Sequence, residues 1–439
     1  MSRELFGTDG VRGRAGEYPL DSSGVDRIAR AVGTHFAEVG EQIVIGCDTR
    51  VSSEKIVADL TKGLTAVGVN AVSAGVIPTP GLAYLTREQE SFVAGIMVTA
   101  SHNTYEYNGI KVFDKNGDKL SDEVEAILNG LIETSIEDRA AGTPRSDTTL
   151  VEQYEDFLVA SRPELSLNNL TIAIDSANGA ASGIAERVFR RFGADVTPLF
   201  DTPNGTNIND RCGATDTHQL AEVVTEKKLA LGIALDGDAD RLILIDNLGR
   251  EVKGDYVLYI LAVANNFEGV VATVMSNLGF EKALTEKHIQ LVRTAVGDRY
   301  VLEGLAQTGY KLGGEQSGHI ILPDILATGD GMLAAIQVLA AVSDSDKTLA
   351  EWCDEVTILP QALVNIALSD RSLLERPDIQ DFVHAQEEKF SGRGRLLIRP
   401  SGTEPLARVM VEADNADELA TQIAKELEIL LSEKRTSND

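Results

Sequence analysis

The fold is decided by QIVIGCDTRVSSEKIVADLTKGLTAVGVNAVSAGV, residues Gln42–Val76, near the start of the chain. This stretch opens on a short apolar run and turns at Asp48-Thr49-Arg50. It continues through a helical segment from about Ser52 to Val67, and beyond Gly68 it becomes apolar and β-prone again. The order strand, polar turn, helix, strand predicts a βαβ unit, in which the two strands pair in parallel and the helix covers one face of the sheet.

The same order recurs twice further along the chain, over Thr171–Leu199 and Val270–Thr294. The C-terminal part differs, because Leu396–Glu412 has the pattern strand, loop, strand, and Ala416–Ser432 follows as an amphipathic helix. We therefore predict three related α/β domains with a smaller α+β domain behind them.

Length and charge exclude several classes of protein. The 439 residues exceed what one hydrophobic core usually serves, so roughly three or four domains are expected. The formal net charge of −28 argues against a nucleic-acid partner, which needs a basic surface. No apolar run reaches the roughly 18–20 residues of a membrane span, and the start shows no signal peptide. The three cysteines lie far apart and fit a reducing compartment, so a cytoplasmic protein without a membrane partner is expected.

The clearest chemical motif is Asp236-Gly237-Asp238-Ala239-Asp240-Arg241, which lies between two apolar runs. Three carboxylates alternate on a loop that leaves a strand end. Oxygen ligands of this kind suit Mg²⁺, and a cation would relieve the repulsion among the three charges. The alternative is a solvated acidic turn. An EF-hand is a poor rival, because Arg241 and Asn247 stand where that loop needs Gly and Glu.

A second motif, Thr99-Ala100-Ser101-His102-Asn103-Thr104, follows the apolar run Phe92–Val98, and Gly109-Ile110-Lys111 comes shortly after it. We do not favour a hydrolase triad here, because adjacent residues rarely bring the base to the hydroxyl and the G-x-S-x-G elbow is missing. An ordinary turn remains the alternative.

Two further loops offer groups for a phosphorylated sugar. Gly313–His319 (GGEQSGH) combines a tight glycine turn with a carboxylate, a hydroxyl and an imidazole, which suit sugar hydroxyls. Arg399–Pro405 (RPSGTEP), with Arg408 beyond it, has the composition of a phosphate cradle. From Ser391 to Val411 there are four Arg and a single Glu, a local reversal of charge in an acidic chain.

These motifs together carry a resemblance. Their order along the chain is FGTDGVRG (6–13), TASHN (99–103), NGIKVF (108–113), DGDADR (236–241), GGEQSGH (313–319) and RPSGTEP (399–405). The chain resembles the α-D-phosphohexomutase superfamily over nearly its whole length. Asn209–Gly213 and Val296–Tyr300 make it most similar to the bacterial phosphoglucosamine branch.

The resemblance implies an α/β fold of four domains around a central cleft, three related α/β domains with mixed sheets and a smaller C-terminal α+β domain. The boundaries we expect are 1–150 with a phosphoserine loop, 151–253 with a metal-binding loop, 254–363 with a sugar-binding loop and 364–439 with a phosphate-binding loop. Closure of the fourth domain over the cleft is also expected, since it would keep water from the reaction.

The resemblance also assigns roles to single residues. Ser101 is implied as the phosphorylated serine and as a ligand, through its phosphate, of one Mg²⁺ per chain that Asp236, Asp238 and Asp240 also hold. Lys111, His319 and Arg12 are implied to assist proton transfer and charge neutralisation. The residues implied to bind substrate are His102, Arg241, Glu315, Ser317, His319, Arg399, Ser401, Gly402, Thr403 and Arg408.

The implied activity is an isomerase that interconverts glucosamine 6-phosphate and glucosamine 1-phosphate, with glucosamine 1,6-bisphosphate as intermediate and activator. Its product would supply UDP-N-acetylglucosamine and cell-wall precursors. The alternatives are a phosphomannomutase or phosphoglucomutase of the same superfamily, a metal phosphatase and a sugar-phosphate sensor. The sequence leaves a homodimer open.

One position departs from the family pattern. Thr104 stands where the family commonly has Pro after Ser-His-Asn. Proline would preset the φ angle of the loop and threonine does not, so the sequence leaves open how the Ser101 loop is held rigid.

Overall fold

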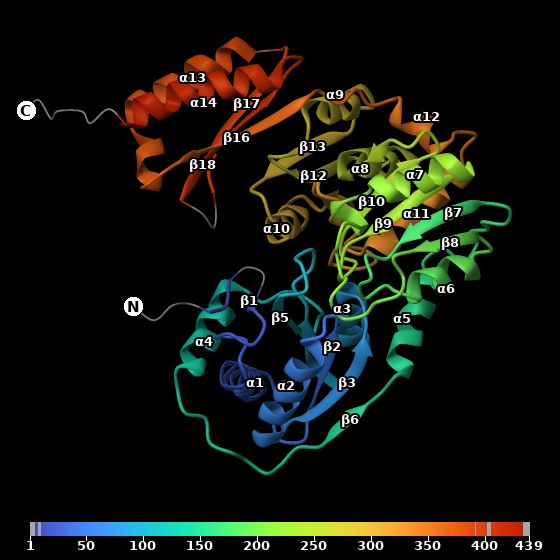
Figure 1. Ribbon diagram of the computed structural model, residues 1–439, viewed down its shortest axis with the longest axis vertical. Helices are drawn as coiled ribbons and strands as arrows, with labels where there is room; N and C mark the ends of the chain where they lie inside the picture. Colours follow the sequence, from blue (N-terminus) through green and yellow to red (C-terminus); the bar gives the residue numbers. More distant parts are fainter. Residues whose placement is uncertain (1–4, 8–9, 391, 402–404, 433–439) are drawn as a thin grey trace, which may run out of the picture. The chain divides into compact units, whose positions relative to one another are not determined.

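The structure is a computed structural model that describes residues 5–7, 10–390, 392–401 and 405–432 (Figure 1). The chain forms two compact units. The first comprises Met1–Met275 and His288–Asp354, and the second comprises Ser276–Lys287 and Glu355–Asp439. The first unit contains three sheets and the second contains one.

The first sheet has six strands in the order β1-β5-β4-β2-β3-β6, and β4, β2, β3 and β6 run parallel. At one edge β5 pairs antiparallel with β4, and β1 pairs antiparallel with β5. The strands are β1 (Val11–Arg14), β2 (Gln42–Cys47), β3 (Asn70–Val76), β4 (Phe92–Val98), β5 (Tyr107–Asp114) and β6 (Pro144–Ser146). The helices of this region are α1 (Ser22–Phe36), α2 (Ser53–Ala66), α3 (Thr79–Glu88), α4 (Asp122–Ile132) and α5 (Thr149–Ala160).

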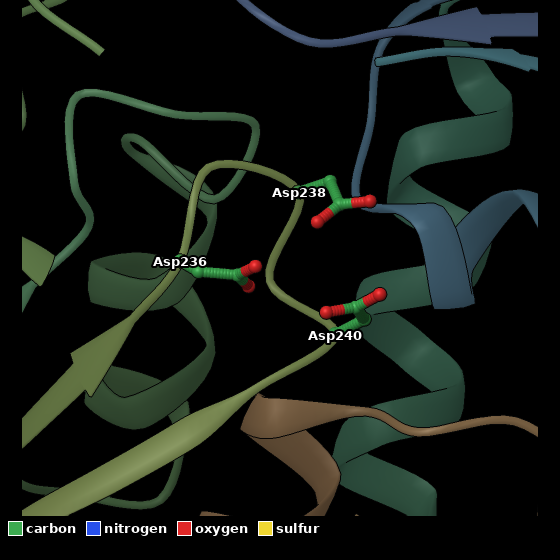
Figure 2. Close-up of side chains that lie close together, drawn as sticks. All are labelled: Asp236, Asp238 and Asp240. Carbon is green, nitrogen blue, oxygen red and sulfur yellow. The ribbon is translucent and has the colours of Figure 1, made fainter. Parts of the chain in front are cut away.

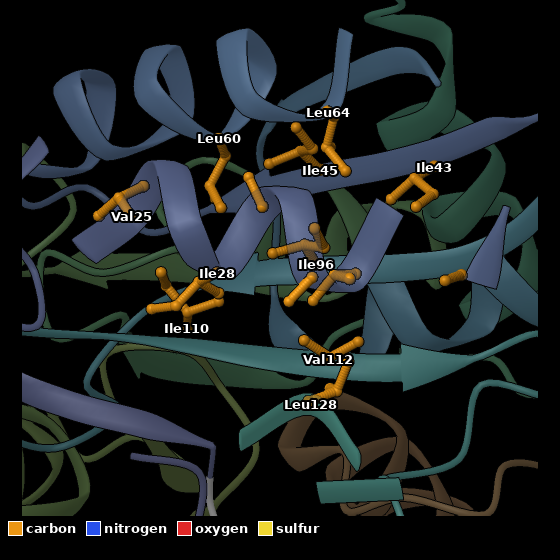
Figure 3. Close-up of a cluster of buried hydrophobic side chains, with 14 of the residues drawn as sticks. Val25, Ile28, Ile43, Ile45, Leu60, Leu64, Ile96, Ile110, Val112 and Leu128 are labelled. Carbon is orange, nitrogen blue, oxygen red and sulfur yellow. The ribbon is translucent and has the colours of Figure 1, made fainter. Parts of the chain in front are cut away.

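Helices cover both faces of this sheet. Figure 3 shows one face, where Ile28 of α1, Leu60 of α2 and Leu128 of α4 pack with Ile45 of β2 and Ile96 of β4 in one fully buried cluster. Residues alternate between the faces of a strand, and α3 packs against β2 and β4 on the other side. Parallel strands need such double coverage, which explains the near-continuous apolar runs in the sequence.

The second sheet repeats this plan with the order β11-β10-β9-β7-β8, in which β9, β7 and β8 are parallel. At one edge β10 pairs antiparallel with β9, and β11 pairs antiparallel with β10. The strands are β7 (Thr171–Asp175), β8 (Asp195–Leu199), β9 (Leu231–Leu235), β10 (Leu242–Asp246) and β11 (Glu251–Val252). The helices are α6 (Ile184–Arg191), α7 (His218–Lys227) and the 3-10 helix η1 (Gly213–Thr215).

The third sheet has the order β13-β12-β14-β15, with β13, β12 and β14 parallel and β15 antiparallel. Its strands are β12 (Gly269–Thr273), β13 (Gln290–Thr294), β14 (Gly313–Gly314) and β15 (Ile320–Ile321). The accompanying helices are α8 (Gly254–Ala264), α10 (Asp298–Thr308), α11 (Gly331–Ser343) and α12 (Leu349–Cys353). Asp330 caps α11 by accepting a hydrogen bond from the backbone N–H of Leu333 at 2.9 Å.

The second unit has a fully antiparallel sheet in the order β16-β18-β17. The strands are β16 (Gln361–Ala367), β17 (Arg395–Pro400) and β18 (Leu406–Glu412). The helices are α9 (Leu278–Glu286), α13 (Pro377–Phe390), α14 (Ala416–Ser432) and the 3-10 helix η2 (Arg371–Glu375). Figure 1 shows α13 and α14 together against the sheet, and Ile379, Val409 and Leu427 belong to their shared core.

The predicted fold class is confirmed: three α/β parts with mixed sheets precede a smaller antiparallel α+β part. The strand and helix ends predicted from the repeated pattern lie within two residues of the observed ends, and the helix Ala416–Ser432 agrees in full. Across the part of the chain that the structure describes, every helix is too short or too polar to span a membrane.

Candidate active site

The chemical motifs lie at one recurring place in the topology, the connection that leads from a strand into its antiparallel neighbour. The Ser101 motif joins β4 to β5, the aspartate motif joins β9 to β10, and the GGEQSGH motif comprises β14 and the loop that ends just before β15. In the second unit, the RPSGTEP motif begins in β17 and leads toward β18. The Ser101, aspartate and GGEQSGH motifs therefore lie on loops at strand ends, where side chains can meet without disturbing the core.

Ser101 is buried and adopts a left-handed backbone conformation with φ of 51°. Its Oγ donates a hydrogen bond to Asp236 Oδ2 at 2.8 Å, which joins the loop after β4 to the loop after β9. His102 Nδ1 lies 3.2 Å from the same Oγ. The expectation that adjacent residues would not meet is therefore wrong, although the contact forms no triad, because Oγ donates to a carboxylate instead.

Asp236, Asp238 and Asp240 form a compact buried cluster. Figure 2 shows their carboxylates turned toward the same space, from the end of β9 to the start of β10. One oxygen of each lies within 4.8 Å of the others. Among the described residues, Asp238 Oδ1 and Asp240 Oδ1 are buried without a hydrogen-bond partner. Buried anionic oxygens in that state fit a divalent cation that takes oxygen ligands.

Lys111 supplies the nearest positive charge to this cluster. Its Nζ lies 2.7 Å from Asp238 Oδ2 and 3.4 Å from Asp240 Oδ2, and the side chain is only 4 % exposed. Burial lowers the pKa of Lys111, but the charges of Asp238 and Asp240 outweigh burial and hold the pKa above its ordinary value. Lys111 is therefore a buried ammonium. Thr79 adds a further contact by donating to Asp238 Oδ2 at 2.6 Å.

The aspartates differ in their electrostatic surroundings. Burial raises the pKa of Asp236 well above its ordinary value, and the charges of Asp240 and Asp238 raise it further. Burial also acts to raise the pKa of Asp240, but Lys111 and His319 outweigh it and hold that pKa well below the ordinary value. The loop thus joins one carboxyl that resists ionisation to another that is firmly ionised.

His319 lies between two carboxylates. Its Nδ1 is 3.9 Å from Asp240 Oδ1 and its Nε2 is 3.5 Å from Asp298 Oδ2. Burial lowers the pKa of this imidazole, but Asp240 and Asp298 outweigh burial and raise the pKa above its ordinary value. Asp298 also pairs with Lys119. Charges of alternating sign therefore connect the loop after β14, the start of α10 and the loop after β9.

His102 carries the opposite shift. Burial lowers its pKa to about 4, and the positive charges of Arg241 and Arg12 lower it further. Arg12 lies on β1 opposite Gly109 of β5, and its charge also acts on Lys111. His102 is consequently a neutral imidazole at neutral pH, within reach of the positive charges of Arg241 and Arg12.

The other predicted sugar-loop residues are less enclosed. Glu315 Oε1 accepts a hydrogen bond from the backbone N–H of Gly297 at 3.1 Å, and its charge acts on Arg241. The backbone N–H of Arg241 donates to Asp236 Oδ1 at 3.2 Å. Ser317 is exposed. The structure therefore places Glu315 and Arg241 with the aspartate loop and leaves Ser317 at the surface of its own loop.

In the second unit, arginines gather at the predicted phosphate loop. Arg399 of β17 lies directly opposite Arg408 of β18 in the antiparallel register. Burial lowers the pKa of Arg399, and the charge of Arg408 lowers it further. Ser401 is buried, its Oγ accepts from Arg408 at 3.4 Å, and its carbonyl accepts from Arg371 at 2.8 Å. Gly402 and Thr403 lie outside the described residues.

Several residues of these sites escaped the sequence analysis. Arg371 and Thr79 lie in stretches without a motif, so nothing in the sequence marked them. Asp298 belongs to Val296–Tyr300, Arg50 to the turn after β2, and Asn209 to Asn209–Gly213. Those three stretches had been noticed, but their side chains were given no role.

Comparison with known proteins identifies the family of the chain. Models of phosphoglucomutase/phosphomannomutase domains match the chain in four successive parts: domain I at residues 3–139, domain II at 152–249, domain III at 253–358 and the C-terminal domain at 363–429. The chain belongs to the phosphoglucomutase/phosphomannomutase family of the α-D-phosphohexomutase superfamily. It is therefore a phosphohexomutase, an isomerase.

Individual relatives span the full length. The chain is 43% identical to a phosphoglucosamine mutase of Alcanivorax borkumensis over 98% of this chain and 99% of the relative. It is 43% identical to a phosphoglucosamine mutase of Thermus thermophilus, with the same coverage. Among solved structures, a phosphoglucomutase/phosphomannomutase family protein of Burkholderia thailandensis has a TM-score of 0.83 at 23% identity, covering 99% of this chain and 98% of that one. That likeness supports the fold alone.

Proposed function

We propose that this chain interconverts glucosamine 6-phosphate and glucosamine 1-phosphate through a phosphorylated Ser101 and a glucosamine 1,6-bisphosphate intermediate. The observation that carries the proposal is the hydrogen bond from Ser101 Oγ to Asp236 within a buried triplet of aspartates, beside the buried ammonium of Lys111. The choice of glucosamine is supported by full-length relatives, about 43% identical, that are named phosphoglucosamine mutases. In the cell, the product would supply UDP-N-acetylglucosamine and cell-wall precursor synthesis in the cytoplasm, where three free cysteines are expected.

We assign the aspartate triplet and the Ser101 phosphate as ligands of one Mg²⁺. The two carboxylate oxygens without hydrogen-bond partners among the described residues support this assignment. When bound, the ion neutralises charge on the transferring phosphoryl group. A solved structure of Aspergillus fumigatus N-acetylphosphoglucosamine mutase, with a TM-score of 0.67 at 19% identity, is described as a complex with GlcNAc-6P and magnesium.

The chain's own groups account for the transfer. The bond from phosphorus to Ser101 Oγ breaks as a bond to O1 of the sugar forms, the O1 proton leaves to a group of the site, and Oγ takes up a proton. Lys111 neutralises charge at the reacting hydroxyl, and His319 holds or moves the proton, assisted by Arg12. The bisphosphate then turns over, and its 6-phosphoryl group returns to Ser101: the bond from phosphorus to O6 breaks as the bond to Oγ forms, Oγ gives up its proton and O6 takes one up, so that proton and phosphoryl counts balance.

The non-reacting phosphate needs a separate binding site. We assign it to Arg399, Ser401 and Arg408, together with Gly402 and Thr403 from the same motif. Arg399 and Arg408 are paired across the two strands, where like charges repel, and a dianionic phosphate would offset that repulsion. Glu315, Ser317 and His319 would bind the sugar hydroxyls, with His102 and Arg241 as further substrate contacts near Ser101.

Substrate profiling tests the proposal. The purified protein receives Mg²⁺ and a trace of glucosamine 1,6-bisphosphate, and kcat/KM is compared on glucosamine, glucose and mannose 6-phosphates while intact mass reports phosphate on Ser101. We expect glucosamine 6-phosphate to give the highest kcat/KM and chelation of Mg²⁺ to abolish turnover reversibly. Preference for glucose or mannose would instead identify another mutase of the family, and release of inorganic phosphate would identify a phosphatase.

A further inference from the structure

The buried guanidinium of Arg50 donates hydrogen bonds to the backbone of the loop that carries Ser101. Arg50 Nη1 donates to the carbonyl of Thr104 at 2.5 Å, and Nη2 donates to the carbonyls of Asn103 at 2.8 Å and Ser101 at 2.9 Å. One side chain from the turn after β2 thus binds three backbone carbonyls of the loop after β4. Three donors in a fixed fork impose an orientation that a single point charge could not.

A second side chain, from the loop after β8, donates to two of these three carbonyls. Asn209 Nδ2 donates to the carbonyl of Ser101 at 2.8 Å and to that of Asn103 at 2.9 Å. Asn209 is 7% exposed. Gly237 completes the enclosure, because a β-carbon there would lie 2.5 Å from the Ser101 carbonyl and 2.7 Å from Asn209 Nδ2. The carbonyl of Ser101 is therefore bound by two donors in a space too small for any side chain at 237.

Arg50 is itself fixed by Asp48. Arg50 Nε lies 2.8 Å from Asp48 Oδ2, and both side chains are fully buried. The same carboxylate oxygen accepts from Thr99 Oγ1 at 2.7 Å, and Thr99 Oγ1 accepts from the backbone N–H of Ser101 at 2.9 Å. Asp48 thereby holds Ser101 on both sides, through Thr99 at the N–H and through Arg50 at the carbonyl.

This network explains how Ser101 keeps its conformation. A left-handed φ of 51° is unfavourable for serine, and Thr104 does not preset the loop as proline would. We propose that Arg50 and Asn209 are positioning residues that hold the Ser101 loop in the conformation that directs Oγ to Asp236. This inference rests on the proposed function for its catalytic consequence, because the role of Ser101 as phosphoryl carrier belongs to that proposal.

The decisive variant is Asn209→Ala, which removes two donors without removing a charge. We expect kcat to fall at least about tenfold, because a misdirected nucleophile loses alignment. KM for glucosamine 6-phosphate should stay within about twofold, since Asn209 contacts the loop backbone and no proposed sugar contact. Backbone amides of residues 101–104 should exchange hydrogen faster than in the wild type, in the protein without substrate. Arg50→Lys, which keeps the charge and loses the fork, should cause a larger fall in kcat.

Asn207→Ala is the matched control. Asn207 lies on the same loop and donates to the carbonyl of Thr202 at 3.2 Å, within that loop. This variant should match the wild type in kcat and in exchange at residues 101–104. The inference is overturned if Asn209→Ala also matches the wild type in both measurements. Failure of the proposed function would look different, because the wild type would then not interconvert the phosphosugars, while the exchange measurement would still test the network.

Discussion

The aspartate loop of the first unit and the arginine pair of the second unit concentrate charge in different ways. Asp238 and Asp240 are buried, and the buried Lys111 lies between them as a compensating cation. Arg399 faces Arg408, a like charge, across two strands, and burial and that neighbour together lower its pKa. In the first region Lys111 offsets the charges of Asp238 and Asp240, although the aspartates also repel one another, whereas in the second region the two arginines repel across the strands. The first arrangement suits the proposed phosphoryl transfer, and the second suits the proposed binding of a phosphate.

The largest expected effect is the loss of mutase activity in a variant that lacks the Ser101 hydroxyl. Ser101→Ala removes the hydroxyl that we propose as the phosphoryl carrier and replaces no charged side chain, so mutase activity should fall by at least about 10³-fold. Intact mass should show the variant without phosphate. Ser146→Ala, at an exposed serine of β6, is the control and should retain full activity. Wild-type turnover by Ser101→Ala would show that the buried region is not the centre of the reaction.

The next effect concerns the stability that Lys111 gives to the buried aspartate loop. Lys111→Met leaves Asp238 and Asp240 without their buried cation, so the free energy of unfolding without Mg²⁺ should fall by about 3 kcal/mol. Denaturant unfolding would measure this loss. Lys55→Met, at a residue whose side chain is 68% exposed in its pair with Asp59, should change stability by less than about 1 kcal/mol. Equal losses in the two variants would remove the distinction between buried and surface pairs.

A carboxyl without a cation beside it provides the third test. Asp175 is buried, which raises its pKa to about 7, while the N–H groups of Gly213 and Ala177 lower it in part. The folded state therefore binds more protons than the unfolded state between about pH 4 and pH 7, and stability should decline as pH rises through that window.

The decline from this one group should be at most about 1.4 kcal/mol per pH unit. Asp175→Asn should flatten it in unfolding measurements across pH 4 to 7, whatever its effect on absolute stability. Asp195→Asn, on the exposed face of neighbouring β8, should keep the wild-type slope. An unchanged slope in Asp175→Asn would show that this carboxyl does not titrate in the window.

The smallest effect on stability is expected for Arg399→Met. Removing one of two facing like charges should leave the free energy of unfolding unchanged or raise it by a few tenths of a kcal/mol. KM for glucosamine 6-phosphate should nevertheless rise about tenfold, because a donor to the phosphate is lost, while kcat changes less. A loss of stability as large as that of Lys111→Met would contradict the contrast between the two regions.

Local sequence patterns predicted the fold class and the positions of the motifs with little error. Phe92–Val98 is a strand because a buried parallel strand is apolar throughout, and Ala416–Ser432 is a helix because its apolar residues share one face. Ser101 and His319 approach the aspartate loop because their own loops occupy equivalent strand ends, and Lys111 reaches that loop from within β5. The contact between Ser101 and His102 was not predicted. The amino-acid sequence around Ser101 does not reveal that this serine adopts a left-handed φ.

The sequence by itself determined the three βαβ segments, the C-terminal helix, the acidic triplet and the arginine-rich loop, because each depends on residues close together in the chain. Only the tertiary structure decided which charges compensate one another. Lys111 and Asp238 are 127 residues apart, and Ser101 and Asn209 are 108 residues apart, yet each pair is joined by a buried hydrogen bond. Such contacts depend on how sheets and loops pack, and the same packing shifts the pKa of Lys111, His102 and Asp236.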